Sequence, residues 1–192
     1  MVPRLAIGML AAVFTVCAAE PGKPGSTLAT IQVTDLAGNP AKLSTAGKVT
    51  AVVFLSAKCP VSNEYNQRMQ ALYKQFEPKG VQFVFVNANF NETNQEIEQH
   101  AKDSEFTFRV WRDANGALAD ALKADVTPEA IVFDRKGTIV YHGAIDDARN
   151  PARVTQHSLK DALAAALDGK APAVKETKAF GCTIKRARKA AS

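Results

Sequence analysis

Two apolar segments of strand length, separated by a segment with helical periodicity, constrain the fold more than any other feature of this sequence. Residues 48–56 (KVTAVVFLS) and 81–89 (VQFVFVNAN) are rich in valine and phenylalanine. Such runs are typical of central strands that are covered on both faces. Between them, apolar side chains recur every three or four residues from Val61 to Phe76, which predicts a helix with one buried face. This order of elements predicts an α/β fold.

The remaining segments complete an alternating pattern of strands and helices. The sequence predicts a strand and a turn at 30–44, a helix at 93–102, a short strand at 108–111, a turn and a short helix at 113–124, a hairpin at 129–143 and a last helix at 155–168. Such a pattern is typical of a three-layer α/β/α sandwich with a mixed central sheet. The 192 residues, 46% hydrophobic and 22% charged, suffice for one such domain.

The N-terminal segment, residues 1–19, is typical of a secretory signal peptide. A single positive charge, Arg4, precedes an apolar run that ends in small residues. We expect cleavage after Ala18 or Ala19 and export to a periplasmic or extracellular compartment, where disulfides persist. Two alternatives stay open: lipidation of Cys17, and retention of the segment as an uncleaved membrane anchor.

The positive charge of the chain is concentrated at its C-terminal end. The formal net charge is +5, but seven lysines and arginines oppose one glutamate from residue 170 onward. We therefore predict a domain at 20–169 and a flexible, basic, Pro/Lys-rich extension at 170–192. No aromatic residues interleave with its terminal charges, so no nucleic-acid partner is expected. The extension is either solvated or in peripheral contact with an anionic membrane or another protein.

Removal of the signal peptide leaves two cysteines, Cys59 and Cys182. Cys59 follows the first apolar strand and precedes Pro60, which suits the first turn of a helix because its missing N–H would have no partner there. Unpaired N–H groups at a helix start stabilise a thiolate, so this position favours a reactive thiol over an inert buried cysteine. An even pair of cysteines in an exported protein also permits a disulfide.

Two local sequences together resemble the thioredoxin-like superfamily, in its peroxiredoxin-related redoxin branch of the alkyl hydroperoxide reductase and thiol-specific antioxidant type. FLSAKCPVS (54–62) lies where thioredoxins have a strand, Cys-x-x-Cys and a helix, and VTPEAIVFDRKGTIVYHG (126–143) is similar to their proline segment and closing hairpin. The resemblance spans about residues 26–169. It implies a thioredoxin-like fold and an oxidoreductase that performs thiol–disulfide exchange or peroxide reduction. No cofactor is implied beyond an external thiol reductant.

The resemblance assigns roles to five residues around the thiol. Cys59 matches the attacking cysteine, and Pro60 begins the helix that activates it. Ser62 replaces the second cysteine of a thioredoxin and is expected to hydrogen-bond the sulfur. Thr127 and Pro128 match the segment whose proline is cis and packs beside the sulfur; the alternative is a trans turn proline.

Departures from the family pattern leave the reaction open. Peroxiredoxins have a proline seven residues before the cysteine and a threonine three before it, where this chain has Val52 and Ser56. Val53 replaces the buried acid of thioredoxins. The candidates for an arginine that polarises a peroxide are Arg109, Arg112 and Arg135.

A second sulfur could come from Cys182. We hypothesise that the extension brings Cys182 to Cys59, so that Cys182 acts as resolving thiol through an intramolecular disulfide. Alternatively, Cys182 pairs with a partner or is a remnant of a fusion junction. The expected partners are a disulfide or peroxide substrate and a thiol-donor protein. Two other classes stay open: a metallochaperone that uses Cys59 with a histidine, and a non-catalytic interaction module.

Overall fold

The structure, a computed structural model, describes residues 19–187. The strands are β1 (Thr30–Thr34), β2 (Pro40–Ser44), β3 (Thr50–Leu55), β4 (Gln82–Asn87), β5 (Val110–Arg112), β6 (Val126–Thr127), β7 (Glu129–Phe133), β8 (Ile139–Gly143) and β9 (Cys182–Thr183). The helices are α1 (Pro60–Asn63), α2 (Asn66–Phe76), α3 (Asn94–Asp103), α4 (Ala117–Leu122) and α5 (Ser158–Leu167), with 3-10 turns η1 (Glu77–Lys79) and η2 (Pro151–Arg153). Of the predicted signal peptide, residues 1–18 lie outside the described part. Within the described range, no helix has the length and hydrophobicity that crossing a membrane requires.

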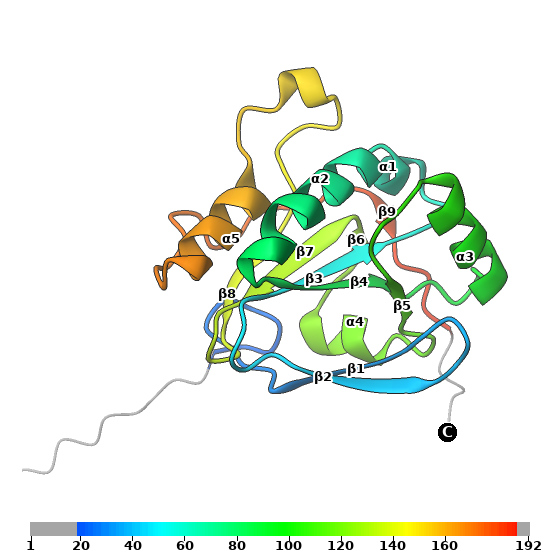
Figure 1. The fold of residues 1–192 in the computed structure, drawn as a ribbon, viewed down its shortest axis with the longest axis horizontal. Helices are drawn as coiled ribbons and strands as arrows, with labels where there is room; N and C mark the ends of the chain where they lie inside the picture. The colour runs from blue at the N-terminus through cyan, green and yellow to red at the C-terminus, as the bar shows by residue number, and fades with distance from the viewer. Residues whose placement is uncertain (1–18, 188–192) are drawn as a thin grey trace, which may run out of the picture.

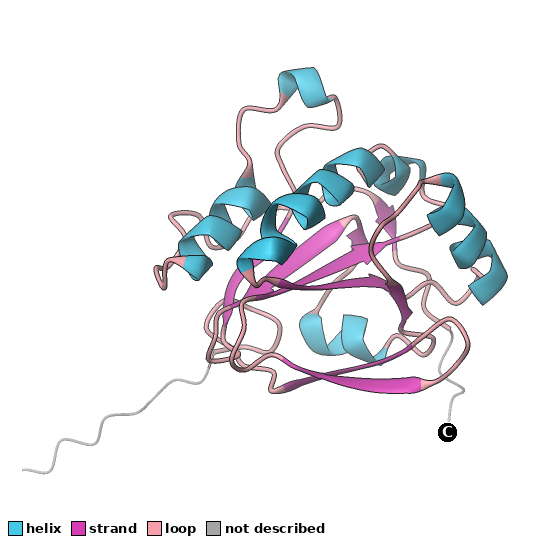
Figure 2. Ribbon diagram, in the orientation of Figure 1, coloured by secondary structure: helices cyan, strands magenta, loops and turns pink. Residues whose placement is uncertain are grey.

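Seven strands form one mixed sheet in the order β2-β1-β5-β4-β3-β7-β8. β4 is parallel to both β3 and β5, whereas the other neighbouring strands are antiparallel. Helices α2, α3 and α5 cover one face of the sheet and α4 covers the other (Figures 1 and 2). The predicted three-layer α/β/α sandwich with a mixed central sheet is confirmed. A separate ribbon pairs β6 with β9.

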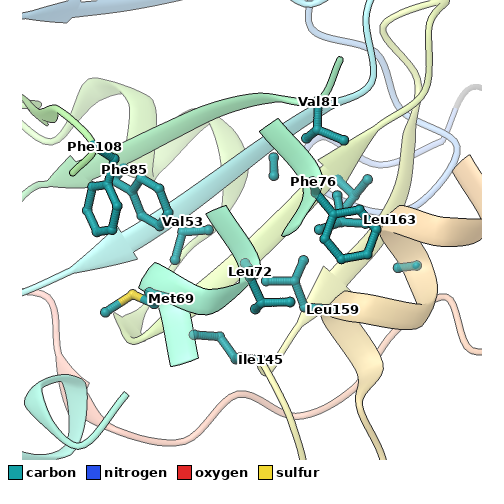
Figure 3. Close-up of a cluster of buried hydrophobic side chains, with 14 of the residues drawn as sticks. Val53, Met69, Leu72, Phe76, Val81, Phe85, Phe108, Ile145, Leu159 and Leu163 are labelled. Carbon is teal, nitrogen blue, oxygen red and sulfur yellow. The ribbon is translucent and has the colours of Figure 1, made fainter. Parts of the chain in front are cut away.

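β3 is a central strand because its side chains alternate between two hydrophobic layers. All six of its residues are buried. Val53 contacts the layer that α2 and α5 cover, whereas Val52 and Phe54 contact the layer that α4 covers. Figure 3 shows the first layer, with α2 and α5 contributing Met69, Leu72, Phe76, Leu159 and Leu163. β3 is therefore fixed on both faces where the chain leaves it toward Cys59.

The single helix predicted between β3 and β4 is divided into α1 and α2. Glu64 and Tyr65 separate them, and the Tyr65 N–H donates to the Ser62 carbonyl (3.0 Å) in a tightened turn. The Tyr65 ring is buried, and its hydroxyl donates to the carbonyl of Ala148 (3.1 Å). The apolar periodicity continues across this break and therefore could not reveal it.

The C-terminal extension packs against the domain, whereas its composition predicted a flexible segment. Beside β8, the His142 N–H donates to the Lys175 carbonyl (3.0 Å) and the Thr177 N–H donates to the His142 carbonyl (3.1 Å). Farther along, β9 pairs with β6, and Ile184 is buried. The described part of the extension, 170–187, is thus held by main-chain bonds and by side chains such as Phe180 and Ile184 that pack on the domain, which Pro/Lys composition does not reveal.

Candidate active site

Cys59 lies at the point where the chain leaves β3 and begins α1. It is the N-cap residue of α1, with extended backbone (φ −88°, ψ 112°), and Pro60 is the first residue of the helix. The Ser62 N–H donates a hydrogen bond to the Cys59 sulfur (3.3 Å). Cys59 is only 2% exposed. The predicted position at a helix start is confirmed, and a thiolate there would accept a main-chain hydrogen bond.

Cys59 is joined to Cys182 by a disulfide, although 123 positions separate them in the sequence. Their Cα atoms are 5.8 Å apart, within the usual range for this bond. The hypothesis of an intramolecular disulfide between the two cysteines is confirmed in this structure.

Thr127 and Pro128 form the wall beside this disulfide, and the peptide bond between them is cis. The Thr127 carbonyl oxygen lies 3.4 Å from the Cys59 sulfur, and Thr127 is buried. In the register of the β6–β9 ribbon, Cys182 is opposite Thr127. The alternative of a trans turn proline is therefore wrong, and this segment lies beside the sulfur as the resemblance implied.

Ser62 contacts the sulfur through its main chain instead of its hydroxyl group. Its side chain is fully buried, and its Oγ accepts a hydrogen bond from the Ser56 N–H (3.1 Å). The expected contact between Ser62 and the sulfur thus exists, but the N–H makes it. The hydroxyl fixes the loop between β3 and α1.

A buried carboxylate, Glu92, organises the loop that carries Cys59. The Ser56 hydroxyl accepts a hydrogen bond from the Cys59 N–H (3.0 Å) and donates to Glu92 Oε1 (2.5 Å). Glu92 Oε2 accepts from the Ala57 N–H (2.8 Å) and from Asn87 Nδ2 (2.7 Å). Sequence reasoning did not identify Glu92. The signal that could have indicated it is its position, as an acidic residue in the loop that follows the second buried strand.

Arg112 supports the same loop from the end of β5. Its guanidinium donates to Asn87 Oδ1 (2.8 Å) and to the carbonyls of Asn89 (2.8 Å) and Glu92 (2.9 Å). Arg112 is itself buried. Its charged group therefore holds carbonyl oxygens of the same loop that carries Glu92.

The other two candidate arginines lie elsewhere. The Arg109 guanidinium lies over the Trp111 ring, 5.0 Å from its centroid, and Arg135 donates to the Leu167 carbonyl (3.1 Å). In residues 19–187, none of the three candidate arginines donates a hydrogen bond to the Cys59 sulfur.

Glu129, directly after Pro128, fixes the start of strand β6 through hydrogen bonds to its main chain. Glu129 Oε2 accepts from the N–H groups of Asp125 (2.8 Å) and Val126 (3.1 Å). Its other oxygen lies 2.8 Å from His142 Nε2, and His142 Nδ1 lies 2.7 Å from the Gly22 carbonyl oxygen. Both acceptors require a donating ring nitrogen, so this geometry favours the imidazolium form.

The pKa shifts of this buried pair agree with that assignment. Burial opposes the charge on His142, but the hydrogen bonds to Glu129 and the Gly22 carbonyl outweigh it and raise the pKa of His142. Burial likewise opposes the charge on Glu129, but bonds from His142 and two backbone N–H groups lower its pKa. Sequence reasoning treated His142 as isolated, because its partner is thirteen residues away on a neighbouring strand.

Among the described residues, no group of three or more histidine, cysteine, aspartate or glutamate side chains is placed to hold a metal ion. His100 Nε2 lies 3.2 Å from the Asn66 amide nitrogen, and His142 contacts Glu129. Both sulfurs of the site belong to the disulfide.

The sequence matches the AhpC/TSA family over residues 24–142, more than half of the chain. A comparison with curated proteins gives no match. Among solved structures, an uncharacterized conserved protein from Geobacillus kaustophilus is 28% identical, with a TM-score of 0.78 over 87% of this chain and 94% of that chain. A hypothetical protein from Sinorhizobium meliloti is 26% identical, with a TM-score of 0.77 over 90% of this chain and 98% of that chain. A secreted disulfide oxidoreductase from Mycobacterium tuberculosis shares the fold at 18% identity, with a TM-score of 0.52 over 72% and 95% of the two chains.

The family match includes Cys59, the start of α1 and the Thr127–Pro128 wall, whereas Cys182 lies beyond it. The similar structures agree with the thioredoxin-like arrangement of sheet and helices. The chain belongs to the AhpC/TSA family and is a thiol-dependent oxidoreductase of the redoxin type.

Proposed function

We propose that this enzyme catalyses thiol–disulfide exchange in a periplasmic or extracellular compartment, with Cys59 as nucleophile and Cys182 as resolving thiol. The observation that carries the proposal is the disulfide itself, which joins a buried helix-capping cysteine to a strand beside Thr127–Pro128. A disulfide between a nucleophile and its resolving thiol is the product that ends one round of exchange.

The exchange proceeds in two substitutions at sulfur. The Cys59 thiolate attacks one sulfur of a substrate disulfide, forms a mixed disulfide and releases the other substrate sulfur as a thiolate. The Cys182 thiolate then attacks the Cys59 sulfur and releases the second substrate thiolate. The substrate gains two electrons and becomes a dithiol, and the enzyme dithiol becomes the Cys59–Cys182 disulfide. A thiol-donor protein reverses this change, so no bound cofactor is needed.

Four neighbouring residues position the Cys59 sulfur or stabilise its thiolate form. Pro60 begins α1, and the Ser62 N–H donates a hydrogen bond to the Cys59 sulfur, which favours its thiolate form. Thr127 and Pro128 lie on the opposite side of the sulfur, and the edge of β6 beside them is the place that β9 occupies. In the proposed reaction, a substrate reaches the sulfur along this edge once β9 has left it.

Export is supported by the N-terminal segment and by the disulfide. A signal-like segment precedes the domain, and the Cys59–Cys182 bond suits an oxidising compartment. A structural neighbour from Mycobacterium tuberculosis is a secreted disulfide oxidoreductase. Attachment through Cys17 or an uncleaved segment, and contact between the basic end of the chain and an anionic membrane, stay predictions.

Peroxide reduction is the second candidate, which the AhpC/TSA match favours. In that reaction, peroxide would oxidise the Cys59 thiolate to sulfenic acid, and Cys182 would then form the disulfide with release of water. The geometry favours exchange instead, because Arg109, Arg112 and Arg135 all serve other contacts and none lies beside the sulfur to polarise a peroxide.

The test compares reduced mature protein with its Cys59→Ser and Cys182→Ser variants. With a peptide disulfide, we expect no exchange by Cys59→Ser and a stalled one-to-one mixed disulfide with Cys182→Ser, detected by mass spectrometry. Exchange by Cys59→Ser at the rate of the unaltered protein would overturn the proposal. A parallel reaction with hydrogen peroxide separates the two candidates: fast exchange with slow oxidation supports thiol–disulfide exchange, and the reverse supports peroxide reduction.

A further inference from the structure

The extension delivers Cys182 to Cys59 as part of a paired strand. β9 is antiparallel to β6, with Cys182 opposite Thr127. One residue beyond β9, the Ile184 N–H donates to the Asp125 carbonyl (2.8 Å). The position of the Cys182 sulfur is therefore set by main-chain register along the edge of β6.

Gly181, the residue before the reacting cysteine, lies directly against the Thr127 carbonyl group. A Cβ atom at position 181 would overlap the Thr127 oxygen and lie 2.7 Å from its carbonyl carbon and 3.3 Å from the Pro128 nitrogen. These are main-chain atoms of a buried segment, and they cannot rotate away as a side chain can. A strand paired with β6 in this register therefore requires glycine before its cysteine.

Side chains on both sides of Gly181–Cys182 also fit the domain. The Phe180 ring packs edge-on against Tyr65, with 6.2 Å between ring centroids. Ile184 is 3% exposed and belongs to the hydrophobic layer that α4 covers. Arg186 Nε donates to Asp120 (2.7 Å). The segment is thus recognised at several positions and not merely at its sulfur.

The same edge of β6 must admit any polypeptide that exchanges with Cys59. With β9 in place, Cys59 is 2% exposed and its sulfur is bonded to Cys182. A substrate sulfur has to take the position that the Cys182 sulfur now occupies. An extended chain can do so by main-chain pairing with β6, the mode in which a strand adds to an exposed edge.

We propose that the substrate of Cys59 is an extended polypeptide segment whose reacting cysteine follows a glycine, and that residues 180–184 are an internal copy of it that competes for β6. The inference rests on the proposed function, because it requires Cys59 to exchange disulfides with a polypeptide. In the reduced enzyme, the internal segment leaves β6 and the substrate pairs in its place. Cys59 attacks the Gly-Cys sulfur, and the second substrate sulfur leaves as a thiolate. Residues 180–184 then return, and the Cys182 thiolate displaces the Gly-Cys thiolate from Cys59.

The experiment uses the mature chain with Cys182→Ser, which keeps Cys59 as its one thiol and cannot resolve a mixed disulfide. The probe is a peptide with the sequence of residues 178–186, KAFGCTIKR, whose cysteine is joined to a chromogenic thionitrobenzoate. The matched probe has alanine in place of glycine. A small disulfide of thionitrobenzoate without peptide measures the intrinsic reactivity of Cys59.

We expect the glycine peptide to react at least about tenfold faster than the alanine peptide, the ratio that corresponds to about 1.4 kcal/mol. Alanine in the peptide slows the reaction, whereas Gly181→Ala in the Cys182→Ser chain should speed it. The internal segment then competes less for β6, and we expect the glycine peptide to react several-fold faster. Circular dichroism checks that this second chain is folded; if it is not, the two peptides alone decide the substrate class.

Equal rates for the glycine and alanine peptides would overturn the inference while leaving the proposed function intact. A glycine preference with no acceleration by a folded Gly181→Ala chain would overturn the competition by residues 180–184. Failure of Cys59 to react with either peptide or the small disulfide faster than free cysteine would overturn the proposed function instead.

Discussion

Cys59 and Cys182 share one disulfide, but the segments that hold them are built differently. The Cys59 N–H is bound to Ser56, whose hydroxyl is bound to the buried Glu92, and Arg112 fixes the carbonyls of the same loop. Cys182 is held by a two-residue strand at the edge of β6. The first arrangement is part of the domain interior, whereas separation of the second withdraws Ile184 from the layer that α4 covers but leaves the strands of the seven-stranded sheet paired. The difference suits a fixed nucleophile and a movable resolving thiol.

Loss of the disulfide is the largest expected effect, because the bond connects residues 123 positions apart. By restricting the unfolded chain, a cross-link over such a loop contributes about 5 kcal/mol in the chain-entropy view. We expect Cys182→Ser to lower the free energy of unfolding by roughly 2–5 kcal/mol, measured in urea without reductant. Wild type with reductant should coincide with the variant. Equal stability of the variant and oxidised wild type would show that the bond is not formed in solution.

Glu92→Gln disrupts the hydrogen bonds that hold the loop carrying Cys59. The substitution removes a buried charge and presents an amide donor to groups that already donate, so we expect a loss of about 2–4 kcal/mol in the free energy of unfolding. The loss should be the same in oxidised and reduced protein, because within residues 19–187 the Glu92 carboxylate is hydrogen-bonded to Ser56, Ala57 and Asn87 and not to the extension.

The matched control is Glu98→Gln, which removes an exposed ion pair with Lys102 and should leave the unfolding curve unchanged within error. A loss of stability seen only in the oxidised Glu92→Gln protein would mean that both sulfurs depend on this network.

Sequence reasoning succeeded where the determinant is local. The period of the apolar residues located β3 and the start of α1, and therefore Cys59, because strand and helix each repeat within a few residues. It failed for Glu92 and His142, whose roles depend on partners brought near by the sheet. β9 has two residues, too few for any periodicity, so the packing of the extension could not be predicted even though cysteine counting suggested the bond.

The Glu129–His142 pair affects both cysteines, because Glu129 binds the N–H groups of Asp125 and Val126 at strand β6. β6 contacts Cys59 and pairs with the strand that carries Cys182. The pKa of His142 is raised, so its contribution is complete below the ordinary imidazole pKa and is lost as pH rises through the folded value. The pKa of Glu129 is lowered, so its contribution is present above the ordinary carboxyl pKa and is lost as pH falls through the folded value. Stability from the pair is therefore greatest between the ordinary carboxyl pKa and the ordinary imidazole pKa.

We expect His142→Gln to lower the free energy of unfolding by about 1–3 kcal/mol in mildly acidic solution, with a smaller deficit at alkaline pH where wild-type His142 is neutral. Urea unfolding across pH measures this difference. His157→Gln, at an exposed position, is the control and should follow the wild-type profile. A deficit for His142→Gln that is independent of pH would show that the imidazole acts by packing instead of charge.

Arg186→Gln tests the Cys182 side with the smallest expected effect. Arg186 lies near the end of the described part of the extension, where it pairs with Asp120 and Asp125 and donates to the Ala124 carbonyl (2.5 Å). Because both carboxylates are exposed to solvent, the charges contribute about 0.5 kcal/mol. In reduced protein, we expect slightly faster hydrogen exchange at residues 182–186, and added salt should reduce the difference between variant and wild type. Lys170→Gln, which removes an exposed pair with Asp168, should leave these amides unchanged. If the amides of the whole segment instead exchanged fast in Arg186→Gln, the ion pairs would be what holds Cys182 beside Cys59. Main-chain pairing with β6 and burial of Ile184 would then be insufficient. A small contribution from Arg186 is consistent with the proposal, because β9 has to leave β6 before a substrate segment can pair there.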